Sequence, residues 1–310
     1  MTQQVLITGG SGFIGSAIVE RMLLNDFRVR ILDDNSRGSL DRLSKVMSSV
    51  EFIEGSIENY EIVKESCRGI DSVIHLAYIN GTRNFYERPG AVLDVAMRGL
   101  LNLADSMKAS SVTKLIVASS SEVYQEPTVY PTPEEVPMVV PDLFNPRYSY
   151  GLGKIVHEFY GMHAMPYLES FKIFRPHNIY GPNMGSLHVV PQLIQKVAAA
   201  IRDGSKLVIE GDGTQTRSFC YIDDFVDAFD LVYRFGSHKG VYNIGSPKEI
   251  SILNLVQTIS EIMGYHGQIE TSEAPLGGTS RRLPDLTKIT ALGYSPSVSI
   301  EQGIKACLNQ

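Results

Sequence analysis

Short apolar runs and amphipathic stretches alternate through the first half of the chain. The apolar runs are typical of buried strands, and they predict strands at 4–8, 28–32, 50–53, 72–76, 114–118 and 170–174. Between them, apolar residues recur at helical spacing and predict helices near 13–24, 58–67, 91–108 and 150–163. This alternation predicts an α/β fold with a doubly wound parallel sheet and helices on both faces.

After about residue 175 the pattern is less regular. Helices are expected near 190–203, 251–263 and 300–308, and strands at 206–209, 219–222 and 241–244. The last two strands are expected to return to the main sheet or to pack beside it. We therefore predict a large domain of residues 1–178 plus about 219–248, and a smaller C-terminal lobe of about 179–218 and 249–310. The span 127–146 is rich in proline and acid and predicts a long loop near the active site.

A glycine-rich turn follows the first predicted strand. Gly9, Gly12 and Gly15 are three residues apart and lead directly into a helical pattern. Free N–H groups at such a helix start suit a pyrophosphate, and glycine permits close approach of the phosphates. The turn therefore predicts a Rossmann-type dinucleotide site built from Gly9, Gly12, Phe13, Ile14 and Gly15.

An acidic residue ends the second predicted strand. Asp33 lies 18 residues after Gly15, where a carboxylate can accept hydrogen bonds from the adenosine ribose. A carboxylate repels a 2′-phosphate, so NAD is expected rather than NADP. Arg37 nearby weakens this preference slightly.

Composition excludes several classes of protein. The 310 residues are 43% hydrophobic and 20% charged, as in ordinary globular proteins. The net charge of −6 and pI near 5.7 argue against a nucleic-acid or anionic-membrane partner. We expect neither a signal peptide nor a membrane span, and hence a cytoplasmic location. Cys67, Cys220 and Cys307 are widely spaced, so neither a disulfide framework nor a bound metal is expected.

A tyrosine and a lysine share one face of the helix predicted at 150–163. Tyr150 and Lys154 are four residues apart, so their side chains lie on the same side. A nearby ammonium and a nicotinamide cation would each lower the phenol pKa from about 10. The phenol could then accept a proton from a substrate hydroxyl as hydride leaves the same carbon. A serine of 119–121 follows a predicted strand and could hydrogen-bond the same oxygen. Tyr60 and Lys64 repeat the spacing without such companions.

These motifs together resemble the extended short-chain dehydrogenase/reductases of the nucleotide-sugar epimerase/dehydratase family, nearly end to end. The matching segments are Thr8–Gly15, His75–Ala77, Ser119–Tyr124, Tyr150–Lys154, Arg175–Pro182, Gln215–Phe219 and Arg281–Asp285. The resemblance implies NAD as cofactor, a nucleotide-diphosphate sugar as substrate, and oxidation of C4 of the sugar to a ketone. It also implies a homodimer built on the helices at 91–108 and 150–163.

The resemblance also assigns roles to single residues. Ser120 takes the place of the catalytic Ser or Thr beside Tyr150 and Lys154. The cofactor-binding positions further include Asn35, Ser56, Ile57, Leu76 and Ala77. The substrate-binding positions are Asn178, His188, Val189, Arg217 and the pair Arg281 and Arg282. Arginines suit a diphosphate because guanidinium groups bind phosphate bidentately, and which residue of the pair does so stays open.

Glu122 bears on the step after oxidation. The run Ser120–Tyr124 resembles family dehydratases and glucuronate decarboxylases, in which the Glu acts at C5, whereas simple 4-epimerases tend to lack an acid there. We therefore expect a sugar-nucleotide dehydratase of the 4,6 type. A 4-epimerase, a UDP-glucuronate decarboxylase and a non-catalytic NAD-binding sensor or scaffold remain alternatives. Glu122 could also be a structural carboxylate that caps a turn.

Three positions depart from the family pattern. Ser56 stands where an Asp is usual, Ala96 where an Asn lies near the cofactor, and Gln125 where a Gly follows Val-Tyr. The stretch 78–84 is also unusual. These departures suggest a specialised substrate.

Overall fold

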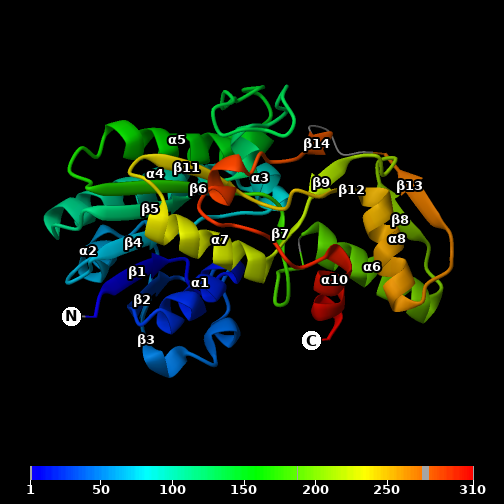
Figure 1. Ribbon diagram of the computed structural model, residues 1–310, viewed down its shortest axis with the longest axis horizontal. Helices are drawn as coiled ribbons and strands as arrows, with labels where there is room; N and C mark the ends of the chain where they lie inside the picture. Colours follow the sequence, from blue (N-terminus) through cyan, green and yellow to red (C-terminus); the bar gives the residue numbers. More distant parts are fainter. Residues whose placement is uncertain (1, 187, 274–278, 310) are drawn as a thin grey trace.

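Seven parallel strands form the main sheet of the computed structural model, which describes residues 2–186, 188–273 and 279–309 (Figure 1). In spatial order they are β3 (Val50–Glu54), β2 (Arg28–Asp33), β1 (Gln4–Thr8), β4 (Ser72–His75), β5 (Lys114–Ala118), β6 (Ser170–Pro176) and β11 (Gly240–Ile244). The strands predicted in the first half all form, and the doubly wound α/β fold is confirmed. The strand predicted at 241–244 returns to the sheet edge beside β6.

Successive residues of the central strands pack into opposite layers. In β1, Val5 and Ile7 belong to one apolar core and Leu6 to the other, as the alternation of strand side chains requires. The first core includes side chains of α1 (Phe13–Leu24) and α7 (Ile222–Phe235), and the second those of α2 (Tyr60–Ser66) and α4 (Pro89–Ala109). Helix α5 (Ser149–His163) packs against α4 on the second face (Figure 1).

Two helices differ from the sequence-based expectation. The apolar run at 219–222 contributes only β10 (Cys220–Tyr221), which pairs with β7 (Ile179–Tyr180) and not with the main sheet. Ile222 already begins α7, whose buried residues Phe225 and Phe229 continue the run at helical spacing. The short helix α3 (Thr82–Glu87) was likewise not expected. It lies in the unusual stretch after β4.

The C-terminal lobe packs against the sheet through the core on the α7 side. Leu193, Val197, Leu255 and Ile259 of the lobe belong to the same apolar cluster as α1 and α7. The helices of the lobe are α6 (Val189–Asp203), α8 (Ile252–Met263), α9 (Thr287–Thr290) and α10 (Ile300–Leu308). Its strands are β8 (Leu207–Glu210) with β13 (Ile269–Ser272), and β9 (Thr216–Ser218) between β12 (Glu249–Ser251) and β14 (Arg281–Arg282).

The segment 127–146, expected to be a long loop, has no helix or strand before the short turn that begins at Pro146. Its backbone is fixed at Thr132, which donates to Leu283 O (2.8 Å) and accepts from Asp285 N–H (2.9 Å). The loop thus ties the region before α5 to the chain that follows β14. Among the helices of the described residues, none combines the length and apolarity needed to cross a membrane.

Candidate active site

A cavity of about 1050 Å³ lies at the carboxyl ends of the strands, between the sheet and the C-terminal lobe. Strand order reverses between β1 and β4, and ligands of open α/β sheets bind in the crevice at such a point. Every residue predicted to act in catalysis, cofactor binding or substrate binding lines this cavity except Asn35 and Arg281. The glycine turn with Asp33 and the Tyr150–Lys154 pair therefore face one space.

Asn35 and Arg281 lie outside the cavity lining. The Asn35 backbone N–H donates to Asp33 (2.9 Å), and its side-chain oxygen is buried without a protein partner. Arg281 forms an exposed ion pair with Glu249 (2.8 Å). Neighbouring residues of a strand point to opposite sides, so β14 directs Arg282 to the cavity and Arg281 away from it. The geometry thus distinguishes two arginines that the sequence could not.

The glycine turn is packed too closely for side chains. Gly9 has a φ of +77°, and a Cβ there would lie 2.7 Å from Ala77 N. A Cβ at Gly15 would lie 2.1 Å from Gly9 O. Gly12 precedes the first turn of α1, and among the described side chains none caps that turn. The first N–H groups of α1 are thus available to an anionic ligand, and the cradle fits a pyrophosphate.

Asp33 is held by backbone at the end of β2. Its two carboxylate oxygens accept from Ser11 N–H and Asn35 N–H, both at 2.9 Å. Arg37 and Arg42 line the same end of the cavity. Burial, together with Arg42, lowers the pKa of Arg37. The orientation of Asp33 is therefore fixed before any ligand binds.

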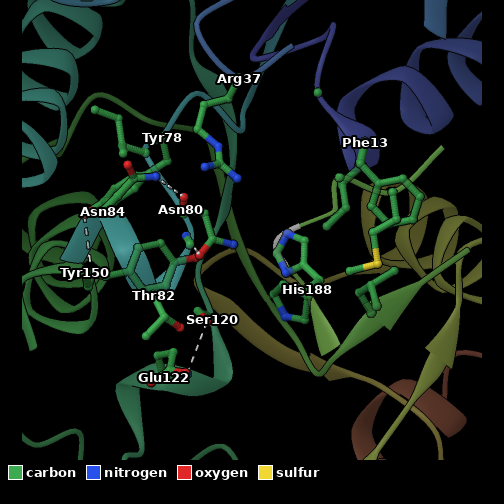
Figure 2. A pocket seen from close by; sticks show the side chains of 18 of the residues that line it. Phe13, Arg37, Tyr78, Asn80, Thr82, Asn84, Ser120, Glu122, Tyr150 and His188 are labelled. Atoms are coloured by element: carbon green, nitrogen blue, oxygen red, sulfur yellow. Dashed lines mark hydrogen bonds between the residues drawn. The ribbon is translucent and has the colours of Figure 1, made fainter. Parts of the chain in front are cut away.

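Tyr150 lies within an aromatic cluster on one side of the cavity (Figure 2). Phe85 stacks on its ring at 4.9 Å, and Tyr78 meets it edge-on at 5.1 Å. Burial raises the pKa of Tyr150, and a hydrogen bond with Ser120 opposes that rise only in part. The lowered phenol pKa expected from the sequence is therefore not a property of the protein by itself.

The position of Lys154 explains this difference. Its ammonium donates to Ala118 O (2.7 Å) and lies 3.9 Å from the ring centroid of Tyr78, against 5.7 Å from that of Tyr150. The ammonium is thus directed at a neighbouring ring and a carbonyl. Burial lowers the pKa of Lys154 to about 7, although Glu158 works in the opposite direction.

Replacing Lys154 by Met should stabilise the fold in acid. Because the folded pKa is about 7 against an ordinary 10.5, the unfolded chain binds more protons between these values, and wild-type stability rises with pH across this window. The variant should gain about 1–3 kcal/mol in the free energy of unfolding at pH 6. Urea unfolding at pH 6 and pH 10 measures this gain, and an equal gain at both pH values would contradict the assignment.

Ser120 and Glu122 form a tight turn directly after β5. Ser120 Oγ accepts from Glu122 N–H (3.2 Å), and this contact opens a short 3₁₀ turn over Ser121–Val123. The turn directs the Glu122 carboxylate to arginines that come from distant parts of the chain. Arg282 donates to it at 2.7 Å, and Arg147 lies 3.8 Å away.

Glu122 is ionised in this setting. Burial alone would raise the pKa of its carboxyl, but the charge and hydrogen bond of Arg282, with Arg147 and Arg217, hold it below the ordinary value. One carboxylate and three guanidinium groups leave two net positive charges at this end of the cavity. Such a cluster suits a diphosphate.

The remaining predicted substrate residues lie on the lobe side. Arg217 donates to the carbonyls of Thr216 (2.7 Å) and Thr279 (2.6 Å), and burial with the nearby Arg282 lowers its pKa to about 10. Asn178 has a left-handed φ of +42°, which asparagine tolerates. His188, with Phe13, faces the aromatic cluster from the opposite side of the cavity (Figure 2), and Val189 begins α6.

Tyr78, Thr82 and Arg147 are among the cavity residues to which the sequence reasoning gave no role. Tyr78 and Thr82 belong to the unusual stretch that follows β4. Its place at the carboxyl end of a central strand was a usable signal. Arg147 lies three residues before Tyr150, just after the loop predicted at 127–146, in the short 3₁₀ turn Pro146–Tyr148.

Comparisons with known proteins agree with this geometry. Residues 5–245 match the model of the NAD dependent epimerase/dehydratase family. The chain is 30% identical to a putative UDP-glucose 4-epimerase of Methanocaldococcus jannaschii, over 98% of this chain and 97% of that protein. It is 32% identical to UDP-glucuronic acid decarboxylase 5 of Arabidopsis thaliana, over 97% and 87%. The crystal structure of UDP-glucose 4-epimerase from Thermotoga maritima with UDP-glucose has a TM-score of 0.88 and 28% identity, with 99% and 98% covered.

Proposed function

Because this chain belongs to the NAD dependent epimerase/dehydratase family, whose members modify nucleotide sugars, we propose that it is a 4-epimerase of a nucleoside-diphosphate hexose. The proposed reaction oxidises C4 to a ketone and reduces it again from the other face of the sugar. The observation that carries the choice is the ion pair between Glu122 and Arg282 at 2.7 Å.

This pairing argues against the 4,6-dehydration that the sequence favoured. Loss of water from C5 and C6 needs a proton donor for the leaving hydroxyl as well as a base at C5. Glu122 is held ionised by three arginines, so it is a poor donor near neutral pH. Ser121, which stands where one dehydratase branch has an Asp, has no carboxyl. Epimerisation needs neither group.

The cofactor of the proposed reaction is NAD, which when bound supplies the hydride acceptor. The N–H groups at the start of α1, next to Gly12, would hold its pyrophosphate. Asp33 would accept hydrogen bonds from the adenosine ribose and repel a 2′-phosphate. The crowding at Gly9 and Gly15 supports this because it keeps the phosphate cradle free of side chains.

The proton chemistry falls to three side chains of the sheet domain. Tyr150 would take the proton of the C4 hydroxyl, and Ser120 would hydrogen-bond the same oxygen. The Lys154 ammonium would stabilise the negative charge that the phenol acquires. Their convergence in one cavity at the carboxyl ends of the strands supports this division of roles.

The diphosphate and the base are assigned to the lobe of about 179–218 and 249–310, together with Asn178, which directly precedes the lobe in the sequence. Arg217 and Arg282 would bind the two phosphates, and the contact of Arg282 with Glu122 would orient its guanidinium group. Asn178, His188 and Val189 would line the remainder of the nucleotide pocket. All five line the cavity, which supports the assignment.

Incubation with NAD and a panel of UDP-, dTDP- and GDP-hexoses and UDP-glucuronate tests the proposal. Mass spectrometry and chromatography should reveal a 4-epimer of unchanged mass. A product that has lost water would favour the dehydratase activity, and a product that has lost carbon dioxide would indicate the decarboxylase activity. Binding of NAD without turnover of any panel member would favour a sensor or scaffold.

Replacing Glu122 by Gln separates an orienting role from an acid–base role. If Glu122 only orients Arg282, kcat should stay within about threefold of wild type while KM rises by about tenfold, since charged hydrogen bonds contribute about 1.5–3 kcal/mol. A group that moves a proton would instead lose about 10²–10⁴ in kcat. Steady-state kinetics on the preferred sugar distinguish the two, and a collapse of kcat would overturn the epimerase proposal.

We further propose a homodimer formed on α4 and α5. The two helices pack together and leave Leu101 and Phe159 46% and 63% exposed. Light scattering should give twice the monomer mass. The double substitution Leu101→Glu and Phe159→Glu should make the protein monomeric, because the proposed dimer interface would bury the added charges. A wild-type monomer would refute the proposal.

A further inference from the structure

Tyr78 has no part in the proposed reaction, yet its ring makes the aromatic contact closest to the Lys154 ammonium among those described. The Nζ atom lies 3.9 Å from the Tyr78 ring centroid, well inside the range in which a ring face attracts a cation. Figure 2 shows Tyr78 beside Tyr150 on the same side of the cavity. The ring therefore lies against the lysine that the chemistry needs, and both residues line the cavity.

Two small residues fix the position of this ring. The Tyr78 hydroxyl lies over Gly153, where a Cβ would be 1.8 Å from it and 2.8 Å from the Ala96 Cβ. The hydroxyl also donates to Tyr150 O at 3.5 Å. Because Gly153 is on α5 and Ala96 is on α4, the Tyr78 phenol packs where the two helices contact each other. Ala96 is also one of the departures from the family pattern.

The charged and titratable groups around Lys154 leave it without a free carboxylate among the described residues. Glu158 of α5 is the nearby carboxylate, and it forms an ion pair with Arg175 at 2.6 Å. His75 at the end of β4 and His157 of α5 stack on each other, and burial lowers the pKa of both, that of His157 to about 3. Both rings are thus neutral at pH 7. The phenols of Tyr78 and Tyr150 complete the surroundings.

We propose that Tyr78 is a positioning residue that holds the Lys154 ammonium beside Tyr150 through the face of its ring. A ring face attracts a cation without adding a negative charge, so it does not compete with the negative charge that the phenol of Tyr150 acquires. The consequence for turnover rests on the proposed function. The contact itself does not, and it can be measured without cofactor or substrate.

Competitive labelling with acetic anhydride, followed by peptide mass spectrometry across pH 5–10, reports the titration of Lys154 in the protein alone. Tyr78→Leu should move the labelling midpoint of Lys154 to lower pH by about one unit, because the ammonium loses the ring. Tyr78→Phe keeps the ring and should restore the wild-type midpoint. Tyr78→Met is a second ring-free variant in case the Leu variant does not fold.

Phe85→Leu is the matched control. It removes a ring of the same aromatic cluster that stacks on Tyr150, and it should leave the Lys154 midpoint unchanged. A midpoint that is unmoved or raised in both ring-free variants overturns the inference, because it would mean that Tyr78 only excludes water.

Activity gives a second readout. The alkaline limb of the kcat profile should shift with the labelling midpoint in Tyr78→Leu and not in Tyr78→Phe. Loss of activity that is equal at every pH would indicate a merely structural role and contradict the inference. If no sugar is turned over by the wild-type protein, the proposed function fails while the labelling result still decides the role of Tyr78.

Discussion

Tyr150→Phe should lower turnover by about a thousandfold or more while the protein stays folded and binds NAD. The substitution removes only the phenol oxygen, so the stacking on Phe85 and the edge contact with Tyr78 remain. Loss of a positioned acid–base group typically costs about 10²–10⁴ in rate, and the same atom would serve in both oxidation and reduction. Steady-state turnover together with fluorescence titration of NAD measures the two effects separately.

Tyr60→Phe is a matched control for this experiment. Tyr60 and Lys64 have the same four-residue spacing on a helix, and the Lys64 ammonium lies 5.6 Å from the Tyr60 ring centroid. The pair lies on α2, outside the cavity lining. The control should keep full activity. Appreciable turnover in Tyr150→Phe would remove Tyr150 from the chemistry altogether.

Arg282→Met should raise KM for the nucleotide sugar by about 10–100-fold and lower the free energy of unfolding by about 1–3 kcal/mol. The loss in binding follows from removing a guanidinium proposed to hold a phosphate. The loss in stability follows from Glu122, which would be left largely buried with a weaker partner, Arg147 at 3.8 Å. Kinetics and urea unfolding measure the two losses.

The stability loss should depend on pH in a definite direction. Arg282 holds the pKa of Glu122 below its ordinary value, so their pairing stabilises the wild-type fold above the unfolded pKa and ceases to do so as pH falls through the folded pKa. The deficit of Arg282→Met should therefore be largest near pH 7 and shrink in acid. Arg281→Met, whose partner Glu249 is at the surface, should cost little at any pH. A deficit independent of pH would contradict the ion-pair account.

The sheet and the crowded glycine turn after β1 were predictable because their signals are local. Each buried strand is an apolar run of the right length, and the glycines of the first turn are dictated by backbone crowding within a few residues. The helix α7 was missed for the same reason. The apolar run at 219–222 locally favours a strand. The helical spacing of Phe225 and Phe229 prevails because both side chains pack against the sheet, which the local sequence does not show.

The electrostatics of the site could not be predicted from the sequence. Glu122 and Arg282 are 160 residues apart, and their pairing follows from how the lobe docks on the sheet. Whether Arg281 or Arg282 faces the cavity depends on the register of a two-residue strand. Likewise, the Tyr150–Lys154 spacing correctly placed both groups on one face, but it could not reveal that the ammonium would lie over the ring of Tyr78.

The last strand of the main sheet comes from residues 240–244, long after the other six have been synthesised. Until then β6 has an open edge, and Phe174 lacks the rings of Phe225 and Phe229 that pack on it at 5.9 and 5.5 Å. An emerging chain thus carries all of the glycine cradle and the Tyr150–Lys154 pair while one sheet face is still uncovered. The apolar face under α7 and the open edge of β6 are thus covered only by segments that follow residue 221, and a chain that is still incomplete exposes this apolar surface.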